Sequence, residues 1–76
     1  MFLNRNMSVL AYANGFTLWH YKSSEESLEQ IERAGYFNKI VTLMGFGDII
    51  IINAKDSTAI RAVKGLSPNV TLGQLS

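Results

Sequence analysis

Two segments of the chain carry apolar side chains at consecutive positions, so both faces of a strand formed there would be apolar. Residues 16–21 read Phe-Thr-Leu-Trp-His-Tyr, and residues 49–52 are four isoleucines in a row. β-Branched residues resist the helix and suit a pleated sheet, which makes residues 49–52 the firmest predicted strand. A strand covered on one side only usually alternates apolar with polar residues. The pattern therefore predicts two strands that need cover on both faces.

Turn residues divide the rest of the chain into shorter segments. Asn14-Gly15 predicts a turn between residues 16–21 and an earlier strand at residues 9–13, because both residues tolerate positive φ. Residues 55–57 and 67–69 predict turns on either side of a strand at residues 59–66, and residues 70–75 would pair back on it as a hairpin. The expected turn formers are Asn14, Gly15, Gly35, Gly47 and Asp48, the last by bonding backbone amides of residues 45–48.

One helix is expected at residues 25–34. Ser23 and Glu26 have the spacing of a capping box, in which each side chain bonds a backbone amide of the first turn. Gly35 would end the helix, because glycine enters the left-handed region without a steric penalty. Residues 38–43 fit either a short helical turn or a strand, and the pattern leaves both open.

These elements predict a mainly β fold of the α+β class, with four to five short strands and one short helix. The sheet would form a small barrel or a partly open antiparallel sheet. The 76 residues make a single domain, 1–76. Residues 1–7 are expected to be a flexible tail, with Met7 as an alternative start.

The small size of the chain points to partner chains. A chain this short buries only ~60–65% of the surface that its unfolded form exposes. It has no cysteine and one histidine, which leaves no disulfide and no Cys- or His-rich metal site, and we expect no cofactor. Hydrophobic residues make up 47% and charged residues 17%, so apolar surface is left over for association. The expected packing and interface residues are Phe16, Leu18, Trp19, Tyr21, Tyr36, Phe37, Ile49, Ile50, Ile51 and Ile52.

Charge argues against several classes of partner. Seven basic and six acidic residues give a net charge of +1, too balanced for electrostatic capture of nucleic acid or an anionic membrane. No apolar run approaches the ~18 residues of a membrane span, and the N-terminus lacks the apolar core of a signal peptide. We expect synthesis in the cytoplasm. Arg61 and Lys64 fall on opposite faces of the strand at residues 59–66, which we interpret as edge charges.

The titratable residues do not form a catalytic pattern. His20 could act as a base or a pH sensor, but no carboxylate or nucleophile stands at an informative spacing from it. A ring bonded to a backbone or hydroxyl partner is the better interpretation. Asp48 and Asp56 lie in turns, where capping of backbone amides accounts for them. We therefore expect no enzyme and no small-molecule substrate.

Two alternatives to a self-associating module remain open. The aromatic residues could form a stacking platform on a small barrel that binds single-stranded nucleic acid. Such platforms are interleaved with basic residues, whereas the lysines and arginines here are dispersed and matched by acids. A small regulator that docks on a host protein would show the same apolar pattern, and the sequence does not separate it from the other two.

Three segments together resemble a family of small phage and prophage proteins. They are residues 14–22 (Asn-Gly-Phe-Thr-Leu-Trp-His-Tyr-Lys), residues 35–38 (Gly-Tyr-Phe-Asn) and residues 47–50 (Gly-Asp-Ile-Ile). Their order and spacing are similar over roughly half of the chain, residues 13–53. The resemblance implies a virion-associated structural component on a head or tail, of the decoration or fibre type. It implies a homo-oligomer, for which a trimer is favoured by analogy with projecting phage proteins, in contact with other virion proteins.

Overall fold

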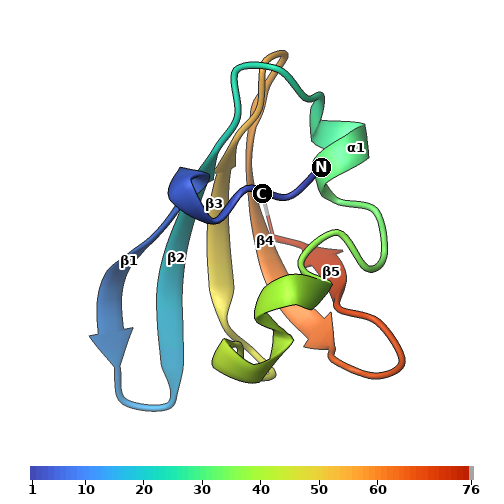
Figure 1. The fold of residues 1–76 in the computed structure, drawn as a ribbon. Coiled ribbons are helices and arrows are strands. Elements are labelled where there is room, and N and C mark those ends of the chain that lie inside the picture. Colours follow the sequence, from blue (N-terminus) through green and yellow to red (C-terminus); the bar gives the residue numbers. More distant parts are fainter. Residues whose placement is uncertain (76) are drawn as a thin grey trace.

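A five-stranded sheet forms the body of the protein, and the computed structural model describes residues 1–75 (Figure 1). Short helices precede the first strand and lie between the second and third. The elements in chain order are η1 (Asn4–Asn6), β1 (Met7–Ala13), β2 (Phe16–Lys22), α1 (Leu28–Ile31), η2 (Asn38–Leu43), β3 (Ile49–Asn53), β4 (Thr58–Gly65) and β5 (Thr71–Gln74). The prediction of a mainly β fold with short helices is confirmed.

The sheet is open and mixed, with the strands in the order β1-β2-β3-β4-β5. Three neighbouring pairs are antiparallel, but β2 and β3 are parallel, which corrects the expected antiparallel sheet at this one pair. Parallel neighbours need a crossover of a dozen residues or more. Residues 23–48 supply that connection and carry both α1 and η2.

Alternation along the central strands puts one row of side chains into the core. In β3, Ile50 and Ile52 are fully buried, whereas Ile49 and Ile51 are half-buried. The parallel register places Ile50 beside Trp19 and Ile52 beside Tyr21, and both aromatic residues are buried. The core therefore lies on one face of the sheet only.

The N-terminal segment, α1 and η2 cover this core face. Their buried side chains are Phe2, Ile31, Phe37, Ile40 and Met44, which form one cluster with the inward row of the sheet. The ring of Phe2 stacks on Tyr21 with a centroid distance of 5.3 Å and meets the edge of Phe37 at 5.5 Å. Residues 1–7, expected to be a flexible tail, instead lie on the sheet, and Met7 begins β1. Burial of a phenylalanine side chain, worth ~1.5–3 kcal/mol, is a physical reason for this order.

The helix α1 is shorter than the sequence predicted and begins later. Ser27 caps it, with a capping box formed by Gln30. The hydroxyl of Ser23 accepts hydrogen bonds from the amides of Glu25 and Glu26, so the serine expected to cap a helix stabilises a turn before it. A helix this short depends on packing rather than on propensity. Only the turn around the buried Ile31 is helical.

Candidate functional site

The face of the sheet opposite the core carries a second row of apolar side chains. β2, β3 and β4 each contribute two of them, and the pairings Leu18–Ile49, Ile49–Ala62 and Ile51–Ile60 make the row continuous across the three strands. All are half-buried. None belongs to the core cluster or to the residues that pack against it. We call this surface the open face and define it by Phe16, Leu18, Ile49, Ile51, Ile60 and Ala62.

Charged side chains stand at the margin of the open face or on the other side of the sheet. Lys22 follows His20 by two positions on the same face of β2, and Lys64 follows Ala62 in the same way on β4. Arg61 points to the core side, where its Nε donates to Glu32 at 2.9 Å. Arg61 and Lys64 thus lie on opposite faces, as expected. Their interpretation as edge charges is wrong, because β5 pairs outside β4.

His20 lies on the same face of the sheet as the open face, in a chain of polar side chains toward the C-terminal ends of β2 and β3. Its Nε2 is 2.6 Å from the amide nitrogen of Asn53, whose Oδ1 accepts a hydrogen bond from the hydroxyl of Thr58 at 2.8 Å. The partner of the ring is therefore a side-chain amide, where a backbone or hydroxyl group was expected, and it is neither a carboxylate nor a nucleophile. This arrangement fits a histidine that is satisfied within a surface.

Asp48 fixes the start of β2 against the loop that leads into β3. Its Oδ1 accepts the amide of Thr17 at 3.0 Å, and its Oδ2 accepts the indole N–H of Trp19 at 3.0 Å and the amide of Gly45 at 2.9 Å. Burial raises the pKa of this carboxyl, but the hydrogen bonds from Trp19, Gly45 and Thr17 outweigh it, and the pKa lies below its ordinary value. The carboxylate thereby holds together the two strands that carry most of the open face.

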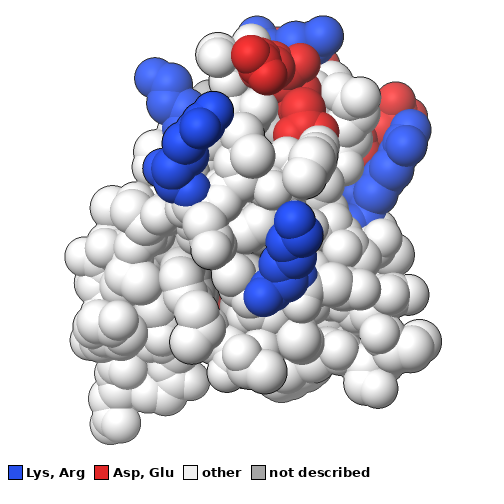
Figure 2. Space-filling model, in the orientation of Figure 1, with Lys and Arg blue, Asp and Glu red and all other residues white. Residues whose placement is uncertain are grey.

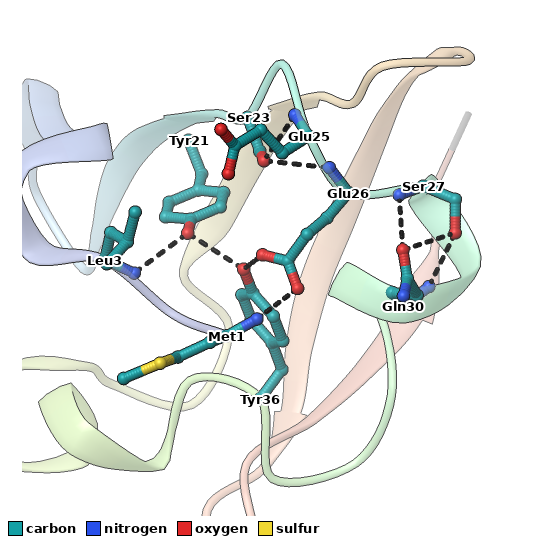
Figure 3. A network of polar contacts seen from close by, with 9 residues as sticks. All are labelled: Met1, Leu3, Tyr21, Ser23, Glu25, Glu26, Ser27, Gln30 and Tyr36. Atoms are coloured by element: carbon teal, nitrogen blue, oxygen red, sulfur yellow. Dashed lines mark hydrogen bonds and ion pairs between the residues drawn. The ribbon is translucent and has the colours of Figure 1, made fainter.

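A second polar network fastens the N-terminal segment to the core side (Figure 3). The amino group of Met1 and the hydroxyl of Tyr36 both bond the carboxylate of Glu26. The hydroxyl of Tyr21 lies 2.9 Å from that of Tyr36 and accepts the amide of Leu3 at 3.0 Å. Burial, with the bond to Glu26, raises the pKa of Tyr36. The pKa of Glu26 is lowered, because its bonds to the amino group and to Tyr36 outweigh the effect of burial.

A cleft of about 850 Å³ lies beside this network, between η1, the first part of β1 and the turn after β2. Its rim mixes basic Arg5 and Lys22 with acidic Glu25 and Glu26, so no single sign of charge prevails. Among residues 1–75, no three side chains of the metal-binding types stand together. No helix in the same range is long and apolar enough to cross a membrane.

The structure divides the residues expected to pack or to form an interface into three groups. Trp19, Tyr21, Phe37, Ile50 and Ile52 lie in the core. Tyr36 is half-buried in the N-terminal network. The open face holds the remaining four, Phe16, Leu18, Ile49 and Ile51.

Two members of the open face, Ile60 and Ala62, were missed. They alternate with Arg61 on the predicted strand at residues 59–66, and this alternation could have placed both on one face of the sheet. Asn14-Gly15 connects β1 with β2, and Gly47-Asp48 precedes β3, as expected. Gly35 lies in a turn but does not end the helix, because α1 already has its C-cap at Glu32. The three glycines all have positive φ.

Burial removes most rings that a nucleic-acid platform would need. Trp19, Tyr21 and Phe37 are buried, so their faces are not available for stacking on bases. The exposed aromatic residues of the described range are Tyr12 and Phe46, which stacking was not expected to use.

Comparisons of the chain with models of protein families, with curated proteins and with solved structures find no match. The open face is therefore identified as the candidate site from the fold alone.

Proposed function

We propose that this protein is a structural building block that associates with copies of itself through the open face, as a component of a phage-type particle. The observation that carries the proposal is the second apolar row on β2, β3 and β4, which lies outside the packed core. A sheet face that is exposed to water usually carries polar side chains. Packing of two such faces about 10 Å apart is the ordinary way to cover them.

The dimensions of the sheet suit an interface of ordinary size. The three strands that carry the open face are five to eight residues long. At ~3.3 Å per residue and ~4.8 Å between strands they present roughly 300 Å² of flat area, and the accessible surface of the side chains is larger. A specific interface buries ~800 Å² per partner. That is about a sixth of the 4621 Å² that the chain exposes. The open face therefore supplies the centre of such an interface, and its margin with the neighbouring strands β1 and β5 would supply the rest.

The resemblance to phage proteins supports the second part of the proposal. Residues 14–22 comprise the first turn and β2, residues 35–38 pack against the core, and residues 47–50 contain Asp48 and the start of β3. The similar segments are thus those that build the scaffold of the open face. A building block needs no catalytic group, which agrees with the absence of a catalytic pattern in the sequence.

The symmetry of the assembly decides its stoichiometry. Two open faces that meet about a two-fold axis give a dimer, because each chain offers the same patch to the other. The threefold assembly favoured by analogy with projecting phage proteins would instead bring the faces together around a central axis. A measured mass equal to two chains would indicate the two-fold dimer, and a mass equal to three chains would indicate the threefold assembly.

A lysine in the middle of the open face tests the proposal. We expect Ile51→Lys to lose association through the open face and to have a smaller mass than the wild type at the same concentration, because that association would bury an unpaired charge. The matched control is Leu43→Lys on η2, at a side chain that is 66% exposed and lies outside the face. It should associate like the wild type. Circular dichroism of both variants checks that the fold is intact. The proposal fails if Ile51→Lys is folded and keeps the wild-type mass.

The particle itself offers a second test. In phage-type particles purified by density gradient from cells that produce the chain, mass spectrometry should find it at a constant copy number per particle. Washing in high salt should not remove it, because apolar burial does not weaken with added salt. Particles that are complete and lack the chain would contradict this part of the proposal.

A further inference from the structure

The strand β1 forms a long, unpartnered edge of the sheet. It has seven residues and pairs only with β2. Its side chains are mostly exposed, and two of them are large and apolar: Leu10 is 54% and Tyr12 82% exposed. The register shifts between Val9 and Ala11, which leaves Leu10 without a cross-strand partner. An edge of this kind presents free backbone groups to any other strand.

The usual protection of a sheet edge is missing from β1. Residues 6–21 include no Asp, Glu, Lys, Arg or Pro, and the nearest charges are Arg5 and Lys22. In the view of Figure 2 most charged side chains lie in the upper half of the molecule, and the lower left, where Figure 1 places the turn between β1 and β2, shows none. Native edges commonly carry lysine or proline to prevent strand addition. This edge resists it only through the irregularity at Leu10.

The opposite edge of the sheet differs from β1. β5 has four residues, and the segment after α1 is bonded to the residues that lead into it. The amide of Gly35 donates to the carbonyl of Val70 at 2.8 Å, and the amide of Val70 donates to Oδ1 of Asn38 at 2.8 Å. The side chains of Asn38 and Asn69 bond each other at 2.9 Å. A head-to-tail pairing of β1 with β5 would have to fit beside this segment.

We propose that β1 is a strand-addition surface for a second copy of this chain, with the two β1 strands antiparallel about a two-fold axis. At such an axis a side chain meets its own copy, so a charge there would be repelled, and residues 6–21 carry none. A foreign strand of opposite charge would find nothing on this edge to recognise. The pairing goes beyond the proposed function, because it uses the edge of the sheet rather than its face. It would join two open faces into one ten-stranded surface.

Charge substitutions at the middle of β1 test the pairing. In the Ile51→Lys background, where the open face cannot associate, we expect a weak dimer in sedimentation equilibrium. Adding Leu10→Lys should weaken it at least about tenfold, because two lysines then face each other across the axis. The matched control is Leu75→Lys, the same residue at the same 54% exposure on the β5 side. Leu75→Lys should leave the dissociation constant of the dimer unchanged.

A mixture of charge variants separates self-pairing from every other cause. Leu10→Lys and Leu10→Glu should each be monomeric in that background, and an equimolar mixture should associate again. Hydrogen exchange should show protection of the β1 amides in the mixture and not in either variant alone. Failure of the mixture to associate overturns the proposal, as does a monomer before Leu10 is changed. A loss with Leu75→Lys equal to that with Leu10→Lys would mean pairing of β1 with β5 and would also overturn it. None of these results depends on whether the open face associates.

Discussion

Replacement of the buried carboxylate of Asp48 by an amide should destabilise the fold strongly although the shape of the side chain is unchanged. In Asp48→Asn, one of the two oxygens becomes an NH₂ group. If it replaces Oδ2, it meets the N–H donors of Trp19 and Gly45, and if it replaces Oδ1, it meets the amide of Thr17. Either orientation leaves at least one buried donor facing another donor.

The magnitude follows from those contacts. A hydrogen bond to a charged group contributes ~1.5–3 kcal/mol, and a buried donor without a partner costs ~1–3 kcal/mol. We expect a loss of about 2–4 kcal/mol at pH 7. A stability of ~0.05–0.15 kcal/mol per residue gives a chain of this length roughly 4–11 kcal/mol in total. The variant should therefore unfold at a much lower urea concentration than the wild type.

The pH dependence of the free energy of unfolding gives an independent test of the contribution of Asp48. The pKa of Asp48 is lowered in the folded protein, so its contribution to stability is complete above the unfolded pKa near 4 and is lost as the pH falls through the folded pKa. Wild-type stability should fall below about pH 4, and this part of the fall should be absent in Asp48→Asn.

Urea unfolding followed by fluorescence of the single tryptophan, at pH 7 and pH 3, measures both effects. The control is Asp56→Asn, which alters an exposed carboxylate that caps the amide of Leu28 at 2.9 Å. It should cost ~0.5–1 kcal/mol. The reasoning is refuted if Asp48→Asn costs no more than Asp56→Asn.

Two further predictions concern the N-terminal segment. Phe2→Ala should lower the free energy of unfolding by about 3–5 kcal/mol, because it empties a site lined by Tyr21, Tyr36 and Phe37. Thermal unfolding by circular dichroism measures this loss, and an unchanged midpoint would show that the segment leaves the core in solution. Because the pKa of Tyr36 is raised in the folded state, its contribution to stability is complete below the unfolded pKa near 10 and is lost as the pH rises above it. Tyr36→Phe should remove that part of the alkaline loss, and alkaline unfolding curves that coincide with those of the wild type would contradict the prediction.

Local patterns in the sequence predicted more of the fold than contacts between distant segments did. The isoleucines of residues 49–52 and the Asn14-Gly15 turn specify their structures through neighbouring residues, and both lie where expected. The direction of β3 beside β2 depends on where residues 23–48 travel, and no local signal records that path. The length of α1 also depends on tertiary packing, because only Ile31 faces the core deeply enough to hold a turn.

The sequence predicted only part of the candidate site, because the choice between the two faces of the sheet also depends on tertiary packing. Doubly apolar strands indicated two rows of side chains, but periodicity alone does not say which row the core takes. Trp19 and Ile50 point inward because Phe2, Phe37 and Met44 cover that side. The role of Phe2 could not be predicted, since a phenylalanine in a short apolar stretch at the terminus does not differ from an exposed one until its partners are known.

The mass of the wild-type chain in solution tests the central claim most directly. Light scattering coupled to size exclusion, over protein concentrations from micromolar to millimolar, should give a multiple of the single-chain mass that persists in high salt. A single-chain mass throughout that range, with the isoleucines of the open face exposed to water and the protein still soluble, would contradict the account.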